Sequence, residues 1–230
     1  MNIKQIVWKH THGIREFLDR YCVRRSRFAK IGKHTQIATP LKLVRANVRI
    51  DDHARIQPGT NMISDKGQLV VKKYSSISSE ACIIPGAHIP TVGLPQFLSM
   101  SHVNDIERTI VVEEDCWVGA RAILLSKAHI CRGAVVSAGA IVTKEVPPYA
   151  VVAGVPAKIV GVRFTLEQVL QHERILYPKE ERLEESYLTN LFNEKYQGLH
   201  AIGTDEMSEE DRKRLTLFKQ KYGIKDYDNN

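Results

Sequence analysis

Two histidines lie among other polar side chains in one central stretch of the chain. His88 lies in IIPGAHIP, and His102 lies in SMSHVNDIERT, just before Asn104, Asp105 and Glu107. Imidazole has an unperturbed pKa of about 6.5, so it is largely neutral at pH 7 and can take a proton as a general base. A neighbouring carboxylate can fix the tautomer of such a base. The stretch is therefore a candidate site of proton transfer, and the alternative for each residue is an ordinary polar turn.

The other reactive side chains form weaker patterns. The remaining histidines, which carry no pattern that predicts a function, are His10, His12, His34, His53, His129, His172 and His200. The four cysteines, Cys22, Cys82, Cys116 and Cys131, include no CxxC pair and no zinc-type spacing. They are few for a disulfide-held chain of this length, so we expect free, mostly structural thiols and no bound metal.

A repeat of six residues indicates what positions these groups. Aliphatic residues recur at Val112, Val118, Leu124, Ile130, Val136 and Val142, and small residues recur at Cys116, Ala122, Ala128, Ala134 and Ala140. A second run in the same period is Val71, Ile77, Ile83 and Ile89, and a looser one starts near residue 30. A step of six taken in threes predicts a triangular coil with a short strand on each side and a turn at each corner. We expect Cys116, in the small inward column, to pack rather than to act as a nucleophile.

Breaks in the period and changes of pattern predict the domains. We expect an N-terminal helical cap over 1–30, a β coil over 31–161 with a loop insertion at 90–109, and a C-terminal helical extension over 162–230. In the extension, Thr165 with Gln168 predicts a capped helix from Leu166, and Ser208 with Asp211 predicts another near the end. The loop is long enough to suggest a functional role.

Composition narrows the setting but not the activity. The chain of 230 residues carries a formal net charge of +7, which suits nucleic acid, anionic lipid or an anionic cofactor. The basic run from Arg24 to Lys30 lacks interleaved aromatic residues for stacking on bases, so we do not expect nucleic-acid binding. The N-terminal segment has charges within its apolar positions, which predicts neither a signal peptide nor a membrane span and favours a cytoplasmic protein.

The repeat resembles that of the hexapeptide-repeat acyltransferases, over about residues 31 to 161. The likeness is strongest in DCWVGA, VSAGAIVTK and PPYAVVAGVPAKIVG, which resemble the sugar and polysaccharide O-acetyltransferase branch. The resemblance implies a left-handed parallel β-helix, a homotrimer and acetyl-CoA as co-substrate. It also implies transfer of acetyl to a hydroxyl of a sugar or polysaccharide precursor, with a histidine as base.

Site residues follow from matching positions to that family. His88 occupies the place of the catalytic histidine, although Ala87 replaces the usual glycine and Ile89 separates it from the proline. We favour His88 over His102, and both could line one cleft. The resemblance places coenzyme A in a groove between subunits and assigns to it Trp117, Gly119, Ala120, Ala138, Thr143, Lys144 and Lys158, with Arg163 as a weaker addition. The small residues in this set also suit the coil itself.

Three other kinds of function stay open at this stage. N-acetylation of an amino sugar, or acetylation of serine or of an antibiotic, is possible on the same fold. A zinc-dependent carbonic anhydrase would need three converging histidines, for which His88, His102 and His129 are the candidates, but its H-x4-H spacing is absent. A non-catalytic scaffold is the third. The acceptor's identity does not follow from any motif in the sequence.

Overall fold

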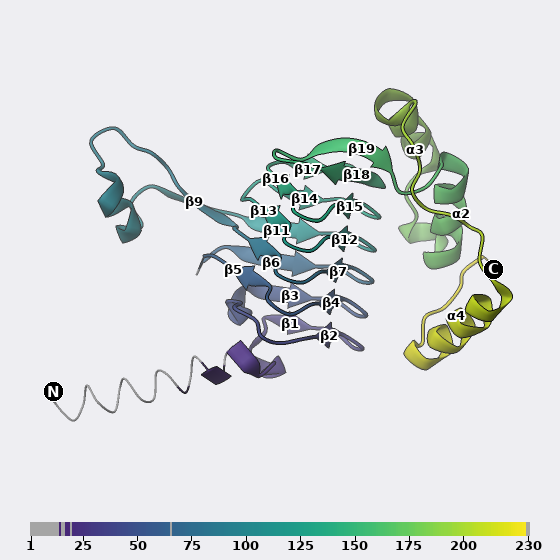
Figure 1. The fold of residues 1–230 in the computed structure, drawn as a ribbon, viewed down its shortest axis with the longest axis horizontal. Coiled ribbons are helices and arrows are strands. Elements are labelled where there is room, and N and C mark those ends of the chain that lie inside the picture. The colour runs from purple at the N-terminus through teal and green to yellow at the C-terminus, as the bar shows by residue number, and fades with distance from the viewer. Residues whose placement is uncertain (1–13, 15–16, 19, 65, 229–230) are drawn as a thin grey trace.

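The structure is a computed structural model that describes residues 14, 17–18, 20–64 and 66–228. Most of the predicted N-terminal helix lies outside these residues; residues 14, 17, 18, 20 and 21 are helical. Within the described part, no helix has both the length and the apolar character needed to cross a bilayer. The prediction of a mainly β chain is confirmed, because three parallel sheets make up the body of the molecule (Figure 1).

The strands of the central coils follow one another in the order A, B, C along the chain. Sheet A contains β1 (Lys30–Ile31), β3 (Val48–Ile50), β6 (Gln68–Val71), β11 (Thr109–Val112), β14 (His129–Ile130) and β17 (Glu145–Val146). Sheet B contains β2 (Gln36–Ile37), β4 (Arg55–Ile56), β7 (Ser76–Ile77), β12 (Trp117–Val118), β15 (Val135–Val136), β18 (Ala150–Ala153) and the antiparallel β19 (Lys158–Val162). Sheet C contains β5 (Asn61–Met62), β8 (Cys82–Ile83), β13 (Ile123–Leu124) and β16 (Ile141–Val142). From β3 to β16, leaving aside the hairpin strands β9 and β10, each turn of the chain adds one strand to each sheet, whereas the first and last coils have no named strand in sheet C.

The six-residue aliphatic column forms the core. In sheet A, Val112 pairs with Ile130 one coil further on, and in sheet C Leu124 pairs with Val142. The six predicted residues from Val112 to Val142 are all almost completely buried. Stacking like on like brings apolar side chains into contact at every rung, which stabilises an otherwise short-stranded wall.

Three corners join the sheets, and we name them by the sheets they connect. The A–B corner repeats one backbone shape, with positive φ at His34, His53, Tyr74, Asp115, Gly133 and Tyr149. The left-handed region is uncommon for residues with a Cβ. Its recurrence at six successive turns shows that the corner geometry, and not the residue type, fixes this conformation.

The C-terminal extension covers the A–B corner (Figure 1). It contains α2 (Leu166–Leu176), η4 (Lys179–Glu181), α3 (Glu185–Leu191), η5 (Phe192–Tyr196) and α4 (Glu209–Tyr222). Thr165 and Gln168 form the expected capping box at α2, and the Ser208 side chain caps α4. Shorter helical turns are η1 (Arg25–Arg27) and η2 (Arg45–Asn47) at the N-terminal end of the coil.

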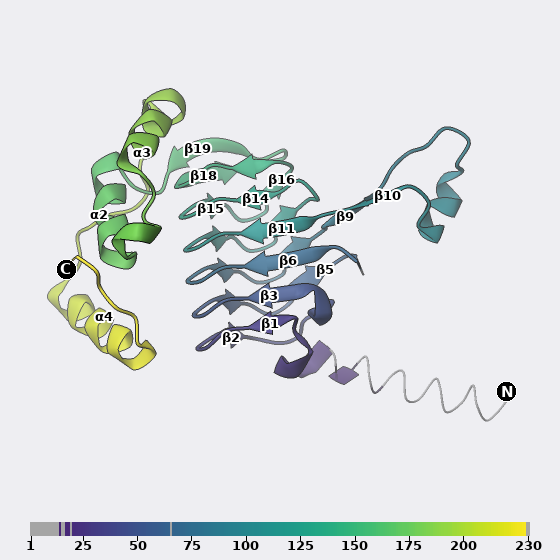
Figure 2. The ribbon, with the colours of Figure 1, turned by 180° about the vertical axis from the view of Figure 1, so that it is seen from behind.

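The C–A corner carries a hairpin that projects away from the coil (Figures 1 and 2). It consists of β9 (Gly86–His88), η3 (Gln96–Ser101) and β10 (Asp105–Glu107), and β9 pairs antiparallel with β10. The chain thus leaves the coil at Gly86, four residues before the predicted insertion. Ile89, which we placed in the aliphatic column, lies beyond β9 in the hairpin and does not continue the core.

Candidate active site

The hairpin brings the two candidate histidines to one carboxylate. His88 at the end of β9 is the register partner of Asp105 at the start of β10. His102 follows η3 with a left-handed φ of 58°, which turns the chain back toward β10. The number of residues between His88, His102 and Asp105 does not predict how far apart they lie in space. The antiparallel pairing of β9 with β10 brings them together.

Asp105 binds one imidazole on each of its oxygens. His88 Nδ1 lies 2.7 Å from Oδ1, and His102 Nδ1 lies 2.7 Å from Oδ2. The hydrogen bonds from His88 and His102 lower the pKa of Asp105, so this side chain is a carboxylate at neutral pH. A carboxylate only accepts hydrogen bonds, so both histidines donate through Nδ1–H. The Nε2 atom of a neutral His88 or His102 is then left as a proton acceptor.

Exposure differs between the acid and its two partners. The Asp105 side chain is 12% exposed, while those of His88 and His102 are 36% and 41% exposed. The carboxylate is thus held behind two imidazoles that reach solvent. Asn104 has another role, because its amide donates to Thr91 Oγ1 across the hairpin at 2.7 Å. Of the three polar neighbours singled out from the sequence, Asp105 is the one that contacts the histidines.

The same three side chains form a possible cation site. Their ligand atoms all lie within 4.8 Å of one another. His129, the third histidine that a zinc enzyme of this fold would need, lies elsewhere: its Nε2 is 2.9 Å from Glu113 Oε1 on sheet A. Within the described residues of one chain, the three-histidine arrangement is therefore not formed.

The predicted cofactor residues divide into two groups, and the first lies at the B–C corner. Trp117 is 54% exposed, and its Nε1–H donates to Ser78 Oγ at 3.0 Å. Gly119 faces the next coil so closely that a Cβ would lie 2.5 Å from the Ala138 backbone N. Only glycine fits that contact, so the coil requires Gly119 whether or not a ligand binds. Ala138 itself is exposed, and Ala120 is half-buried.

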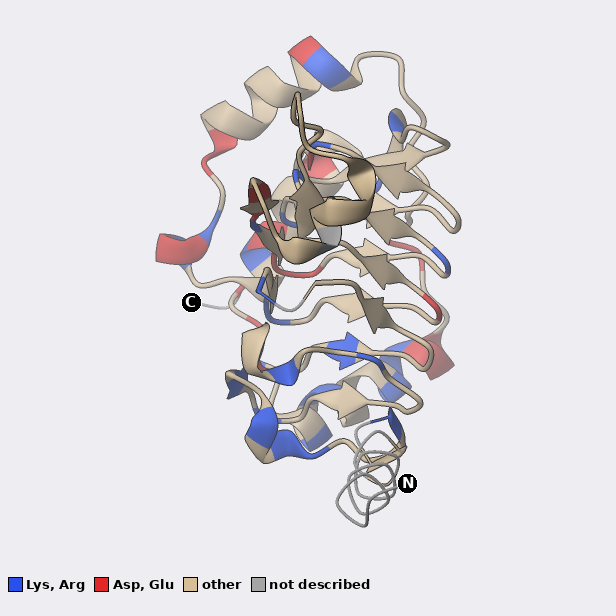
Figure 3. Ribbon diagram, turned by 90° about the vertical axis from the view of Figure 1, so that its left-hand side faces the viewer, with Lys and Arg blue, Asp and Glu red and all other residues tan. Residues whose placement is uncertain are grey.

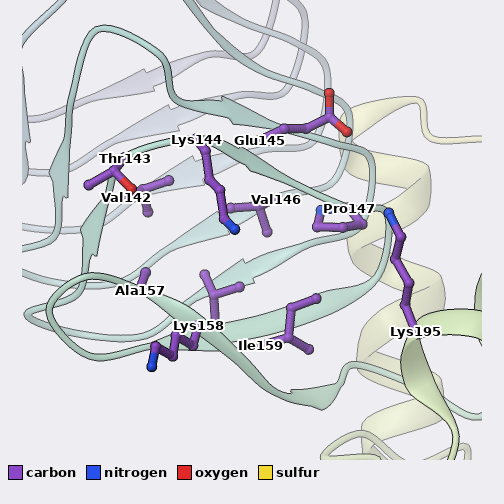
Figure 4. A pocket seen from close by; sticks show the side chains of 11 residues that line it. Val142, Thr143, Lys144, Glu145, Val146, Pro147, Ala157, Lys158, Ile159 and Lys195 are labelled. Atoms are coloured by element: carbon purple, nitrogen blue, oxygen red, sulfur yellow. The ribbon is translucent and has the colours of Figure 1, made fainter.

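The second group lies at the C–A corner, at the C-terminal end of the coil. Thr143, Lys144 and Lys158 line a pocket of about 450 Å³ (Figure 4). Its apolar floor includes the core residues Val142, Val146 and Val152, and Glu145 and Lys195 stand at its rim. Lys195 belongs to η5, so the C-terminal extension supplies a third cation that sequence reasoning missed. No repeat or motif leads to Lys195, because its place depends on how the extension folds back.

Strand spacing relates this pocket to the histidines. β8, β13 and β16 are consecutive strands of sheet C, the hairpin leaves just after β8, and Thr143 directly follows β16. Neighbouring strands are about 4.8 Å apart, so β8 and β16 are separated by about 10 Å. The hairpin and the pocket therefore share the C–A corner of the molecule, two coils apart.

The cysteines do not add a nucleophile to this corner. Cys116 is almost fully buried, and burial raises the pKa of its thiol well above the usual value. Burial likewise raises the pKa of Cys131 to about 12. A thiol is a poor nucleophile when protonated, so the packing role predicted for Cys116 is consistent with its surroundings. Arg163 lies at the A–B corner, where it pairs with Asp115, and does not line the pocket at the C–A corner.

No family model matches the chain. It is 49% identical over 51 residues to the 2,3,4,5-tetrahydropyridine-2,6-dicarboxylate N-acetyltransferase of Staphylococcus aureus strain JH9, which is 22% of this chain and 21% of the relative. The enzymes of strains JH1 and Mu3 match to the same extent. The chain thus matches about a fifth of the length of these curated relatives.

Solved structures share the architecture over a longer range. A hexapeptide-repeat acetyltransferase from Vibrio cholerae O1 biovar eltor, complexed with acetyl coenzyme A, has a TM-score of 0.57 and 20% identity, covering 70% of this chain and 90% of that one. A maltose O-acetyltransferase from Clostridium difficile 630 has a TM-score of 0.55 and 15% identity, covering 70% and 89%. A Bacillus cereus N-acyltransferase in complex with dTDP and 3-hydroxybutyryl-CoA has 0.52 and 15%, covering 66% and 92%. The predicted resemblance to hexapeptide-repeat acetyltransferases is confirmed, and at these identities it is a likeness of fold.

Proposed function

We propose that this chain is an acetyl-CoA-dependent acetyltransferase built on a left-handed parallel β-helix. The proposed acceptor is a hydroxyl of a sugar or polysaccharide precursor. The observation that carries the proposal is the Asp105 carboxylate with an imidazole on each oxygen, placed at the same corner as a lysine-lined pocket. The structural neighbours that bind acetyl-CoA or CoA derivatives support the choice of cofactor.

In the proposed reaction His88 is the general base. Its Nε2 takes the proton from the acceptor hydroxyl as that oxygen attacks the thioester carbonyl carbon. The C–S bond then breaks, and the imidazolium returns the proton to the leaving thiolate, giving an acetyl ester and free coenzyme A. Asp105 fixes the tautomer of His88 and stabilises the imidazolium that forms during the transfer. His102 is the alternative base, since it holds the same carboxylate in the same way.

The two groups of predicted cofactor residues support a trimer. Thr143, Lys144 and Lys158 lie at the C–A corner, whereas Trp117, Gly119, Ala120 and Ala138 lie at the B–C corner. Because the two groups lie at different corners, we infer that two chains packed side by side place one group on each wall of a groove. We infer a homotrimer in which each groove binds one acetyl-CoA. A backbone N–H near Ala120, the proposed donor to the oxyanion, then comes from the chain that supplies the opposite wall.

The three predicted regions acquire separate roles in this proposal. Residues 31–161 form the catalytic coil, and its hairpin, in place of the predicted 90–109 insertion, presents the base. Residues 162–230 cover one corner and supply Lys195, whose ammonium would meet phosphate charge of the cofactor together with Lys144 and Lys158. Residues 1–30 are proposed as the cap of the first coil.

N-acetylation is the second candidate. It is favoured by the 49% identity over 51 residues to an N-acetyltransferase. The same base and groove would serve an amine acceptor, provided that the amine enters unprotonated or loses its proton to His88. The scaffold alternative predicts no turnover with either class of acceptor.

The test is free-thiol release from acetyl-CoA with a panel of sugars and amino sugars. Wild-type protein is expected to turn over at least one hydroxyl acceptor, and His88→Ala is expected to lose about 10²- to 10⁴-fold in kcat. His129→Ala, a histidine of similar exposure bound to Glu113 on sheet A, is the matched control and should retain activity. Loss in His102→Ala with full activity in His88→Ala would reassign the base, and acetylation of amines alone would replace the hydroxyl acceptor. No turnover with any acceptor would contradict the proposed acetyltransferase activity.

A further inference from the structure

The positive charge of the chain is concentrated at one end of the coil. Residues 20–63 contain ten Lys and Arg residues and two Asp residues, whereas the whole chain has a net charge of +7. The remaining residues are therefore close to neutral as a group. Figure 3 shows the Lys and Arg positions gathered on the first coils, while the later coils and the helices carry both signs. We call residues 20–63 the basic end.

Most cations of the basic end reach solvent. The exposed ones come from the N-terminal helical stretch, from η1 and from the first coils, and they are Arg20, Arg25, Arg27, Lys30, Lys33, Lys42, Arg49 and Arg55. The two acids compensate little of this charge. Asp51 pairs with Lys30, and Asp52 accepts a hydrogen bond from the Lys33 backbone N–H. The described coils at this end thus carry a net positive charge.

Exposed apolar side chains stand beside this charge. Ile14 is 62% exposed, Phe17 60% and Tyr21 48%, and the Phe17 and Tyr21 rings are 4.9 Å apart. Spacings of three and seven residues place side chains on one side of a helix. The end of this helical stretch is fixed to the coil, because Leu41 N–H donates to Arg20 O and Arg45 Nη2 donates to Cys22 O. The apolar group is therefore held against the basic end and points away from the core.

We propose that this end of the molecule docks on the surface of an anionic phospholipid bilayer. Aromatic and aliphatic side chains beside exposed cations are the combination that enters the headgroup region, with the apolar groups inserted and the cations next to lipid phosphates. The proposed contact is peripheral, because these side chains reach the headgroup region and not the bilayer centre. Duplex nucleic acid fits less well, since its phosphates would meet the cations but leave Ile14 and the two rings without an apolar partner.

The surface is separate from the candidate active site. His88 and Asp105 lie on the hairpin at the C–A corner, and the lysine-lined pocket lies at the C-terminal end of the coil. Docking of the basic end therefore leaves both accessible. The inference does not depend on the proposed acetyl transfer, and its test needs no acceptor.

The experiment measures binding of the full chain to vesicles by co-sedimentation. Vesicles of phosphatidylcholine with phosphatidylglycerol should bind the protein, and vesicles of phosphatidylcholine alone should not. Each cation near an anionic surface contributes about fivefold to binding, so Arg49→Glu or Arg55→Glu should weaken it at least about tenfold. Lys213→Glu on α4, 74% exposed, is the matched control and should bind like the wild type.

A second pair of variants tests the apolar group. Phe17→Ser should weaken binding about tenfold, whereas Phe218→Ser, at a similarly exposed phenylalanine on α4, should not. Added salt should release the protein, since the Debye length is about 10 Å at 0.1 M. Circular dichroism and size-exclusion chromatography of each variant separate lost binding from lost folding or assembly.

Several outcomes would overturn the inference. Failure to bind anionic vesicles at low salt would do so directly. A Phe17→Ser variant that changes oligomeric state but not vesicle binding would assign the apolar group to a contact between copies of the chain. Oligonucleotide binding as tight as vesicle binding and insensitive to Phe17→Ser would favour nucleic acid, and displacement of vesicles by acetyl-CoA would assign the cations to the cofactor.

Discussion

The A–B and C–A corners of the coil both hold aspartates that bind histidines, but they surround them differently. At the A–B corner, Asp115 accepts from His172 Nε2 at 2.9 Å and pairs with Arg163 at 2.8 Å, beneath the C-terminal helices. At the C–A corner, Asp105 is held by His88 and His102 on a projecting hairpin. Asp115 thus has a guanidinium among its partners, whereas both of these partners of Asp105 are imidazoles.

This contrast separates structural from chemical use of the same residue types. His172 binds Asp115 through Nε2, and its ring packs against the Phe164 and Tyr149 rings. His88 uses Nδ1 and leaves Nε2 for another molecule. A histidine that directs its accessible nitrogen inward stabilises the fold, and one that directs it outward can act on a ligand. The following predictions test that division.

The largest stability effect is expected at Glu173 under the A–B corner. Its side chain is 2% exposed, accepts from Tyr149 OH at 2.6 Å and pairs with Arg132 at 3.1 Å. Glu173→Ala would leave the buried Arg132 charge and the Tyr149 hydroxyl without this partner, so the free energy of unfolding should fall by about 3–5 kcal/mol. Urea denaturation followed by circular dichroism measures it. The matched change Asp105→Ala at the open corner should leave the urea midpoint unchanged, and equal losses at both corners would contradict the comparison.

At the C–A corner the large effect should be on the rate of acetyl transfer. Asp105→Asn keeps the shape but replaces one of the two acceptor oxygens with an NH2 donor and removes the negative charge, so it cannot accept Nδ1–H from both imidazoles or stabilise an imidazolium as a carboxylate does. We expect kcat/KM to fall about 10- to 100-fold while the urea midpoint stays the same. Steady-state thiol release over a range of pH measures it. Glu107→Gln, a neighbouring carboxyl on β10 that pairs in register with Gly86, is the control and should retain activity. Unchanged kcat/KM in Asp105→Asn would remove the positioning role.

The two corners also differ in what the sequence could predict. The coil follows from its period, because one aliphatic residue every six, from Val112 to Val142, has to face inward and stack. The hairpin register does not follow, since the insertion breaks the period and its pairing depends on contacts across the loop. Because this register cannot be predicted, the sequence alone leaves His88 and His102 as alternative bases, although both bind the same carboxylate.

The packing of the C-terminal helices over the A–B corner could not be predicted from the sequence either. Helix capping predicted where α2 and α4 start, because Thr165 and Ser208 act on backbone within one turn. The partners of Asp115 and Glu173 come from segments far apart in the chain, and no local pattern encodes such contacts. Lys195 likewise lines the pocket through a contact between distant segments, which no local pattern predicts.

Glu113, which directly follows β11, should show an intermediate effect on stability. It is 23% exposed and binds His129; burial opposes its ionisation, but the hydrogen bond from His129 and the charge of Lys72 outweigh it, so its pKa is lowered. A lowered folded-state pKa stabilises the protein above the unfolded-state value and loses this contribution as pH falls through the folded-state value. Glu113→Gln should therefore cost about 1 kcal/mol at pH 7. The difference from wild type should shrink below about pH 4.3, the usual glutamate pKa. Urea midpoints across pH measure it, and a pH-independent difference would contradict the assignment.

The smallest effect should come from the far end of the covered corner, where α4 meets the first coils. His53 Nε2 lies 2.8 Å from the Tyr222 carbonyl, yet α4 has no buried residue, so few contacts hold this helix to the coil. His53→Ala should reduce global stability by less than about 1 kcal/mol, but it should increase hydrogen exchange within α4. Hydrogen-exchange mass spectrometry resolves the two effects, with α2 as the internal reference because Glu173 anchors it. Equal slow exchange in α2 and α4, with an equal response to His53→Ala, would contradict this prediction. The helices over the A–B corner would then unfold as one cooperative unit, including those that make no buried ion pair.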